Sequence, residues 1–257
     1  MRKKNRPVIH RKATERSHHR CLRGLAIAAI LIVPILTLYK IPAATGAPKH
    51  RSPDGATAAW EKTAGPPGIQ INVIFKANNI VYAGTEMQGV YKSTDNGLSW
   101  VPANAGIERA SISDIIVSGP NVLAAAKSSC TPYLNVFKST DNGATWNGTS
   151  GLAGKVAHSF VIKGTSVWVT FAALPNESGI ARSTDNGNTW QVVPSIITNA
   201  GESIVSDNAI IVAEDNFIWR STDDGMSWDV VEQFALTGIS SFAKAGTKLF
   251  GAATTGI

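Results

Sequence analysis

The sequence predicts an all-β protein in which one structural unit recurs along the chain. Four segments are almost alike: VYKSTDNGLSW from Val90, VFKSTDNGATW from Val136, IARSTDNGNTW from Ile180 and IWRSTDDGMSW from Ile218. Their first serines are 46, 44 and 38 residues apart, and no sustained 3.6-residue periodicity of an amphipathic helix separates them. We therefore expect a β-propeller of four-stranded antiparallel blades, four complete and a fifth partial, preceded by a single apolar N-terminal helix.

The first 55 residues differ from the repeats in composition. Residues 1–23 contain nine Lys and Arg and a single acidic residue, and residues 24–41 include sixteen consecutive uncharged residues, Gly24 to Tyr39. This order predicts an export signal, either a cleaved signal peptide or a retained signal-anchor helix, followed by a linker at 42–55. The positive-inside rule leaves the basic tail in the cytoplasm. We expect the remainder to be exported, periplasmic or extracellular, or anchored in the plasma membrane by residues 24–41.

Charge and cysteine content narrow the class of partners. The whole chain has a formal net charge of +6, but from Ser52 onward it has 12 basic and 17 acidic side chains. The exported part is therefore acidic, which removes the electrostatic reason to expect nucleic acid as a partner. Cys21 and Cys130 lie on opposite sides of the apolar segment, so we expect no internal disulfide and a hydrophobic core that provides the stability.

Residues 56–257 form the predicted propeller. In the first unit three short runs, 71–75, 80–85 and 89–94, precede the recurring motif, and a fourth begins at Trp100. Trp60 lies 40 residues before Trp100 without a motif before it, as a last strand standing alone would. Ile257 aligns with Val90, so the fifth blade is interrupted. We expect a C-terminal truncation or an incompletely closed five-blade ring.

The recurring segment S-T-D-[ND]-G-x-[ST]-W, here called the Ser-to-Trp turn, predicts a hairpin between the third and fourth strands. Asn-Gly and Asp-Gly adopt positive φ with little penalty, and the preceding Asp can accept backbone N–H groups. We expect the Ser to bond across the loop and the Trp to pack over it, so that each outer hairpin is fixed. This structural role is assigned to Ser93, Asp95, Gly97, Trp100, Ser139, Asp141, Gly143, Trp146, Ser183, Asp185, Gly187, Trp190, Ser221, Asp223, Gly225 and Trp228.

The motif resembles the Asp-box, or bacterial neuraminidase repeat, of sialidases, sortilin-type receptors, xyloglucan-cleaving glycosidases and photosystem II assembly-factor-like proteins. In those families the box is a structural turn away from the ligand site, so the resemblance, over about residues 56–257, implies a scaffold similar to the non-catalytic members. A calcium loop is not expected. An EF-hand-type loop needs Glu eleven residues after its first Asp, and those positions hold Gly106, Leu152, Ile196 and Phe234. We expect neither metal nor cofactor.

In antiparallel blades the Ser-to-Trp turns occupy one face, so we expect any ligand site among the opposite loops. The candidate binding residues are Glu86, Gln88, Glu108, Arg109, Tyr133, Glu177, Glu214 and Asp215. No catalytic residues are assigned. Similarity to sialidases would require three arginines around a carboxylate, and after Ser52 the chain has only Arg109, Arg182 and Arg220, two of which precede motif serines.

These observations predict a binding or scaffold module for a glycan or a protein. The alternatives are a glycoside hydrolase of the sialidase-like superfamily, with site residues partly outside this chain, and a photosystem-assembly-factor-like chaperone. The sequence does not indicate an oligomeric state.

Overall fold

The computed structural model describes residues 65–66, 68–127, 136–173, 177–194, 197, 200–233 and 238–253. The chain divides into two compact units, Met1–Ala59 and Trp60–Ile257, and every described residue belongs to the second. The apolar helix predicted at 24–41 lies outside the described residues. Within the described part, no helix is long and apolar enough to cross a bilayer.

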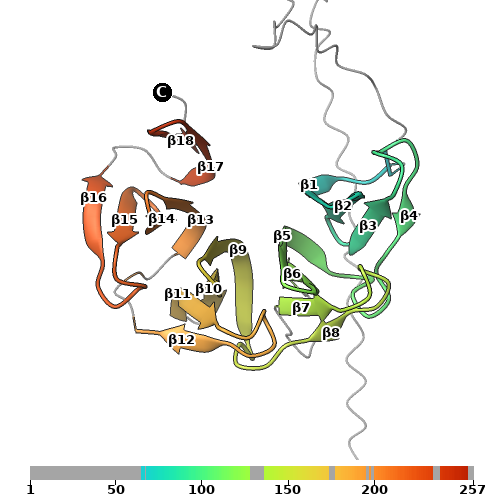
Figure 1. Cartoon of the computed structure of the whole chain (residues 1–257), viewed down its shortest axis with the longest axis horizontal. Helices are drawn as coiled ribbons and strands as arrows, with labels where there is room; N and C mark the ends of the chain where they lie inside the picture. Colours follow the sequence, from blue (N-terminus) through green and yellow to red (C-terminus); the bar gives the residue numbers. More distant parts are fainter. Residues whose placement is uncertain are drawn as a thin grey trace, which may run out of the picture. The chain divides into compact units, whose positions relative to one another are not determined.

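The described residues form five antiparallel sheets that follow one another in the sequence, and in each sheet the strands pair in sequence order (Figure 1). Their strands are β1 (Ile71–Ala77), β2 (Ile80–Thr85), β3 (Val90–Ser93) and β4 (Val101–Pro102) in sheet 1; β5 (Ser111–Ser118), β6 (Asn121–Lys127), β7 (Val136–Ser139) and β8 (Asn147–Gly148) in sheet 2; β9 (Lys155–Lys163), β10 (Ser166–Ala173), β11 (Glu177–Ser183) and β12 (Gln191–Val193) in sheet 3; β13 (Ala200–Ser206), β14 (Ala209–Glu214), β15 (Phe217–Ser221) and β16 (Asp229–Gln233) in sheet 4; β17 (Ile239–Ala245) and β18 (Lys248–Ala253) in sheet 5. The all-β prediction is confirmed for the described residues.

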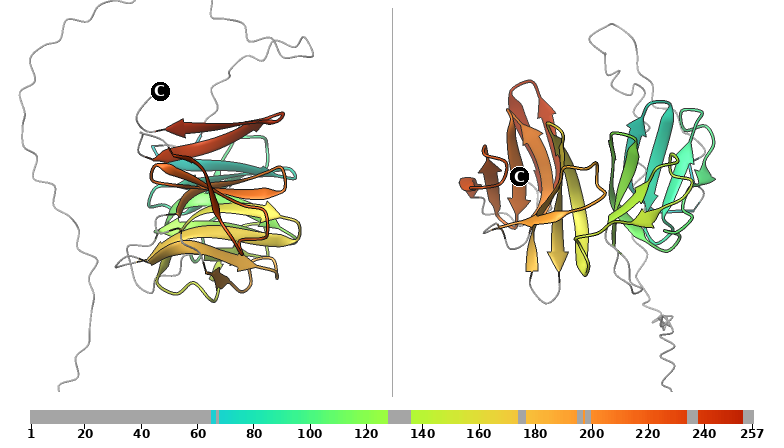
Figure 2. Two further views of the ribbon diagram at one scale, coloured as in Figure 1. Left: turned by 90° about the vertical axis from the view of Figure 1, so that its left-hand side faces the viewer. Right: turned by 60° about the horizontal axis from the view of Figure 1, so that its bottom comes forward.

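The sheets pack face to face in sequence order (Figure 2), and the first strand of each contacts the first strand of the next. The apolar core lies in the seams between sheets. Tyr82 of sheet 1 belongs to one buried cluster with Ile115 and Trp146 of sheet 2. Leu123 of sheet 2 is clustered in the same way with Phe160 of sheet 3. Each sheet therefore depends on its neighbours to remove its apolar faces from water.

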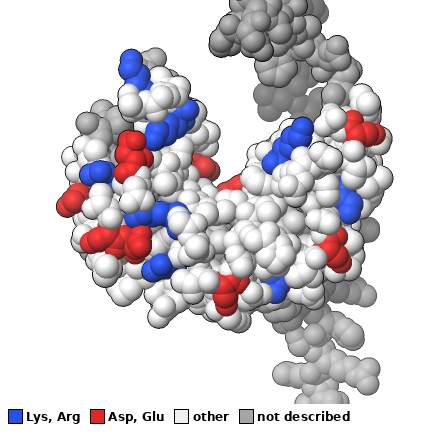
Figure 3. Space-filling view, viewed as in Figure 1, with Lys and Arg blue, Asp and Glu red and all other residues white. Residues whose placement is uncertain are grey.

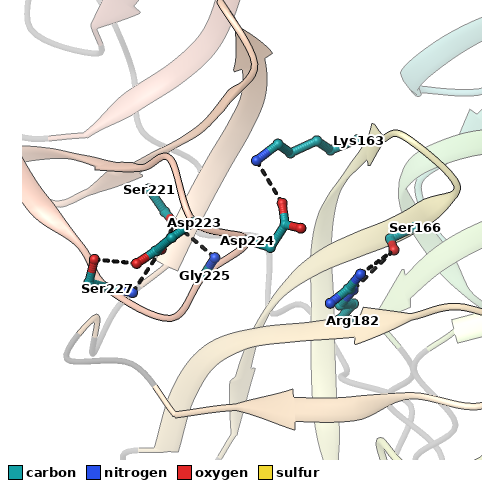
Figure 4. A network of polar contacts seen from close by, with 8 residues as sticks. All are labelled: Lys163, Ser166, Arg182, Ser221, Asp223, Asp224, Gly225 and Ser227. Atoms are coloured by element: carbon teal, nitrogen blue, oxygen red, sulfur yellow. Dashed lines mark hydrogen bonds and ion pairs between the residues drawn. The ribbon is translucent and has the colours of Figure 1, made fainter.

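Each Ser-to-Trp turn is closed by one set of hydrogen bonds within eight residues. In sheet 2 the Ser139 hydroxyl donates to Asp141 Oδ1 (2.7 Å) and accepts the Gly143 N–H (2.7 Å). Thr145 donates its N–H to Asp141 Oδ1 (2.8 Å) and its hydroxyl to Oδ2 (2.6 Å). Asn142 and Gly143 have φ of 56° and 82°, which explains the Asn-Gly pair. The turn after β15 repeats these contacts (Figure 4).

These hydrogen bonds also stabilise the ionised form of the turn aspartates. The hydroxyl and N–H of Ser99 donate to Asp95, and they lower its pKa to about 2. In the turn after β15 the hydroxyl and N–H of Ser227 hold the pKa of Asp223 at about 2. A carboxylate that accepts several hydrogen bonds is more stable charged than protonated. The four turn aspartates are therefore ionised, and each one accepts hydrogen bonds from its own turn.

The turn also contacts the preceding sheet, which the expectation of a Trp packed over its own loop did not include. Trp146 is buried against sheet 1, where its indole N–H donates to the Ala103 carbonyl (2.8 Å) and its backbone N–H to Ala105 (2.9 Å). The backbone N–H of Trp190 donates in the corresponding way to the backbone carbonyl of Ser150, which follows β8 of sheet 2 (3.0 Å). The expected packing of the Trp over its own turn is found for Trp100 and Trp228, whose indole N–H groups donate to the Gly97 and Gly225 carbonyls (3.1 Å each).

The turn glycine lies close to the preceding sheet. A Cβ on Gly143 would lie 3.2 Å from the Tyr82 ring, one on Gly187 2.5 Å from Leu123, and one on Gly225 3.0 Å from Trp168. Tyr82, Leu123 and Trp168 are each the third residue of the second strand in the preceding sheet. One position in each of sheets 1 to 3 therefore receives the turn of the next sheet.

Replacing Ser139 by alanine should destabilise the protein. The change leaves the buried Gly143 N–H without its acceptor, which costs about 1–3 kcal/mol. Chemical denaturation of Ser139→Ala measures this loss. Thr140→Ala is the matched control, because Thr140 is the exposed neighbour in the same turn and should change stability by less than about 0.5 kcal/mol. Equal effects of the two changes would contradict the assigned role of the serine.

Alanine at Gly187 should be more harmful than alanine at Gly164. Both glycines have positive φ, 80° and 60°, but a Cβ at Gly187 would overlap Leu123 whereas nothing lies within 4 Å of one at Gly164. The two variants share the backbone strain of about 1 kcal/mol. The difference between their unfolding free energies isolates the seam contact, and we expect about 1–3 kcal/mol from overpacking. If the two variants are equally stable, the turn is not tightly seated on the preceding sheet.

Candidate functional site

The two ends of the strands differ in how their polar side chains are used. At the end that carries the Ser-to-Trp turns, here called the turn end, these groups link neighbouring sheets. Ser118 and Asn121 of sheet 2 donate to Asn186 in the turn of sheet 3 (3.0 and 2.8 Å). Lys163 of sheet 3 pairs with Asp224 in the turn of sheet 4 (2.6 Å; Figure 4). The turn end is thus largely occupied by contacts that hold sheets together.

A pocket of about 350 Å³ opens at the turn end between Lys163 and the turn of sheet 4. Its side chains include Asn208, Thr222 and the exposed Met226. The Lys163 ammonium is mostly buried and is neutralised by Asp224. The charged groups of this pocket are therefore committed to the seam, and it is a weaker candidate than the opposite end.

The opposite end, here called the loop end, contains a network of polar side chains between sheets 1 and 2. Glu86, in the loop after β2, accepts hydrogen bonds on Oε2 from Asn72 Nδ2 (2.9 Å) and from the Ser111 hydroxyl (2.5 Å). Asn72 Nδ2 also lies 3.2 Å from the Ile112 carbonyl. Because three segments of the chain meet here, the exposed carboxylate is held in one orientation. Such preorganised groups are typical of binding sites.

The other predicted candidates in sheets 1 and 2 lie near this network without joining it. Gln88 accepts a hydrogen bond from Tyr91 on its side chain (3.4 Å) and from Asn104 on its carbonyl (3.0 Å). Glu108 accepts the Gly106 N–H (3.0 Å), which lowers its pKa. Arg109 is exposed beside it. Together with Glu86 they give sheets 1 and 2 a polar loop end.

The remaining candidates are dispersed. Tyr133 lies outside the described residues, and Glu177 begins β11, where only its backbone pairing with Ala173 is described. Glu214 ends β14 as a buried residue whose carboxylate accepts the indole N–H of Trp219. Asp215 follows it with φ of 45°, and its carbonyl accepts the Gly238 N–H (3.0 Å). Glu214 thus belongs to sheet 4 and is not brought together with Glu86 by any described contact.

Polar side chains on the first strand of several sheets link that sheet to the next, a role that the sequence did not predict. The pairing of each first strand with its neighbour shifts by one residue near its start, which marks a β-bulge. Around these bulges Ser113 donates to the Ala157 carbonyl of the next sheet (3.0 Å), and Ser159 accepts the Ser203 N–H (3.2 Å). The sequence feature that could have indicated this role is a pair of polar residues next to an apolar run, such as Ser113–Asp114 in SDIIV.

Asp114 is the charged residue among these side chains. Its Oδ2 accepts the Phe160 N–H of sheet 3 (2.6 Å) and its Oδ1 accepts the Ile115 N–H (2.8 Å). Burial raises the pKa of Asp114 to about 6, although both hydrogen bonds favour the charged form. A raised pKa is common in catalytic acids, but both oxygens of this one are engaged by backbone groups. Its geometry fits a link between sheets 2 and 3.

The arginines of the described part are dispersed over the fold. Arg182 donates to the Ser166 hydroxyl through Nε and Nη2 (3.0 and 2.8 Å; Figure 4). Its guanidinium also lies over the Trp168 ring. Arg220 extends exposed from β15 in another sheet. Basic and acidic side chains are interspersed on the face in Figure 3. Within the described part, no group of three or more His, Cys, Asp or Glu could hold a metal ion. The loop end is suited to binding polar groups.

Comparison with known proteins found similar structures but no similar sequence family. No protein-family model matches the sequence, and no curated protein is similar enough to be reported as a relative. The extracellular domain of BT4673 from B. thetaiotaomicron matches with a TM-score of 0.58 at 11% identity, over 75% of this chain and 27% of that one. YCF48 from Cyanidioschyzon merolae matches with a TM-score of 0.53 at 13% identity, over 77% and 72%.

An ancestral GH74 enzyme matches with a TM-score of 0.51 at 19% identity. The match covers 67% of this chain and 25% of the enzyme, so the chain spans about a quarter of that protein. At these identities the similarity concerns the fold alone. Together with the antiparallel sheets packed in sequence order, it supports a β-propeller fold.

Asp114 should make stability depend on pH. Its pKa in the folded protein, about 6, exceeds the ordinary 3.8, so the native state retains its proton more strongly than the unfolded state. The stabilisation is complete below about pH 4 and is lost as the pH rises through about 6. As the pH rises from about 4 to about 7.5, the denaturation midpoint of the natural protein should fall relative to the midpoint of Asp114→Asn. Asp229→Asn, an exposed change on β16, should follow the natural protein. Parallel curves for all three proteins would exclude this role of Asp114.

Proposed function

We propose that this protein is an exported or membrane-anchored β-propeller that binds a glycan or a protein at its loop end and carries out no catalysis. The observation that carries the proposal is the carboxylate of Glu86, exposed yet fixed by Asn72 and Ser111. A fixed polar group on a rigid sheet binds a partner without losing much conformational entropy. Its hydrogen-bonding chemistry suits sugar hydroxyls or the N–H groups of a peptide.

Three further observations support the proposal. The basic segment and the following apolar run have the order of an export signal. One similar structure is an extracellular domain, and another is YCF48 bound to a D1 peptide, matching at a TM-score of 0.54. The repeated turns also have the sequence pattern of the Asp-box, which we infer to act here as a structural element.

A glycoside hydrolase is the principal alternative, and the similarity to an ancestral GH74 enzyme favours it. Hydrolysis of a glycosidic bond commonly needs two carboxyl groups about 5–10 Å apart across the sugar. Glu86, Asp114 and Glu214 belong to sheets 1, 2 and 4, and Asp114 and Glu214 are hydrogen-bonded inside the fold. A chaperone similar to photosystem assembly factors is a second alternative, favoured by the similarity to YCF48. Both receive less support than the binding module.

The proposal is tested with the full chain in detergent on glycan and extended-peptide arrays. We expect binding to one of the two classes, and Glu86→Gln should weaken it about ten-fold, as for loss of a charged hydrogen-bond partner. Asp229→Asn, on the outer strand β16, is the control and should bind normally. The same proteins are incubated with a panel of fluorogenic glycosides. Turnover by the natural chain that Glu86→Gln abolishes would replace the binding module by the hydrolase.

A further inference from the structure

Met87, in the loop between β2 and β3, combines two unfavourable features. Its φ is 64°, whereas every other described residue with a positive φ is Gly, Asn or Asp. Its side chain is also 48% exposed. A residue with a Cβ costs free energy in the left-handed region, and an exposed apolar side chain gains none from burial. Gly or Asn at this position would therefore give a more stable fold.

The backbone of this loop is held in place by the segment that follows β4. The Gly89 N–H donates to the Ala110 carbonyl (2.9 Å). The Gln88 carbonyl accepts a hydrogen bond from Asn104 Nδ2 (3.0 Å). These contacts on the two residues after Met87 explain why the loop has one conformation, but they do not involve the methionine side chain. The side chain is thus presented to solvent on a fixed backbone.

We propose that Glu86 and Met87 together bind a lysine or arginine side chain of a protein partner. The Glu86 carboxylate pairs with the cationic group, and the Met87 thioether packs on the aliphatic stem that carries it. This inference rests on the proposed function, because it assigns one class of ligand to the same loop end. Backbone strain that the surrounding structure maintains is found preferentially at ligand-binding positions.

The chemistry of the two side chains favours a basic side chain over a sugar. Lys and Arg pack their aliphatic stems on apolar surface while the charged group stays at the surface. A carboxylate makes stronger hydrogen bonds with a charged donor than with an uncharged hydroxyl. Methionine is flexible and polarisable, and it is used often at surfaces that bind peptides. Glu86 and Met87 are adjacent and both exposed, so one loop offers a contact for each part of the ligand side chain.

The charge of the surrounding residues is complementary to such a partner. The segments 85–89 and 103–111 contain two acidic residues, Glu86 and Glu108, and one basic residue, Arg109. The chain from Ser52 onward has 12 basic and 17 acidic side chains. An acidic surface of this kind attracts a basic protein. A divalent cation fits less well, because it takes several oxygen ligands and the described part contains no group of three or more His, Cys, Asp or Glu that could hold one.

The test applies the full chain in detergent to an array of random-sequence decapeptides and, in parallel, to a glycan array. We expect the bound peptides to contain Lys or Arg. Acetylation of their lysines removes the charge and should weaken binding about ten-fold or more. Higher ionic strength should weaken it as well.

Met87→Asn separates the role of the side chain from that of the loop. Asn tolerates the left-handed conformation, so the variant should have a denaturation midpoint equal to or above that of the natural chain. It should nevertheless bind the basic peptides about ten-fold more weakly. Met226→Asn is the matched control, because Met226 is an exposed methionine at the turn end, and this variant should bind normally. Normal binding by Met87→Asn would overturn the inference.

The remaining outcomes separate the inference from the proposed function. If glycans or uncharged peptides bind and Glu86→Gln weakens their binding, the inference is wrong and the proposed function stands. If basic peptides bind equally well to the natural chain and to Glu86→Gln, both are wrong. Both are wrong also if the natural chain binds nothing on either array.

Discussion

The packing of one sheet on the next is the interaction on which the rest of the structure depends. A four-stranded sheet with two apolar faces cannot bury either of them by itself. The buried clusters of this protein accordingly contain side chains from two consecutive sheets, such as Tyr82 with Ile115 and Leu123 with Phe160. Stability is thus shared between neighbours, as in other repeat architectures.

Polar contacts fix how one sheet is oriented on the next, which apolar packing alone does not specify. At the turn end, hydrogen bonds close each Ser-to-Trp turn, and its glycine then fits against the preceding sheet. Along the first strands, bulges direct Ser113, Asp114 and Ser159 toward the next sheet. The turn end and the first strands are thus both engaged in holding sheets together, and the loop end is where we propose that a partner binds. Its clearest feature is the network around Glu86.

The turns could be predicted because the hydrogen bonds that close them lie within eight residues. Asp141 accepts only from residues two to four positions away, so the spacing of Ser, Asp, Gly and Thr contains the whole arrangement. Four copies of the pattern also gave the repeat length and hence the all-β sheets. The loop end could be chosen as well, since antiparallel strands must alternate their connections between two ends.

The site residues illustrate what could not be predicted. Ser111 and Asn72 meet Glu86 from positions 25 and 14 residues away, across a seam whose register no local pattern specifies. The partners of Trp146 and Asp114 lie 43 and 46 residues away. The sequence by itself therefore determined the strands, their turns and the order of the sheets, because these follow from contacts between near neighbours. Only the tertiary structure decided which side chains meet between sheets, because that depends on how one sheet is seated on the next.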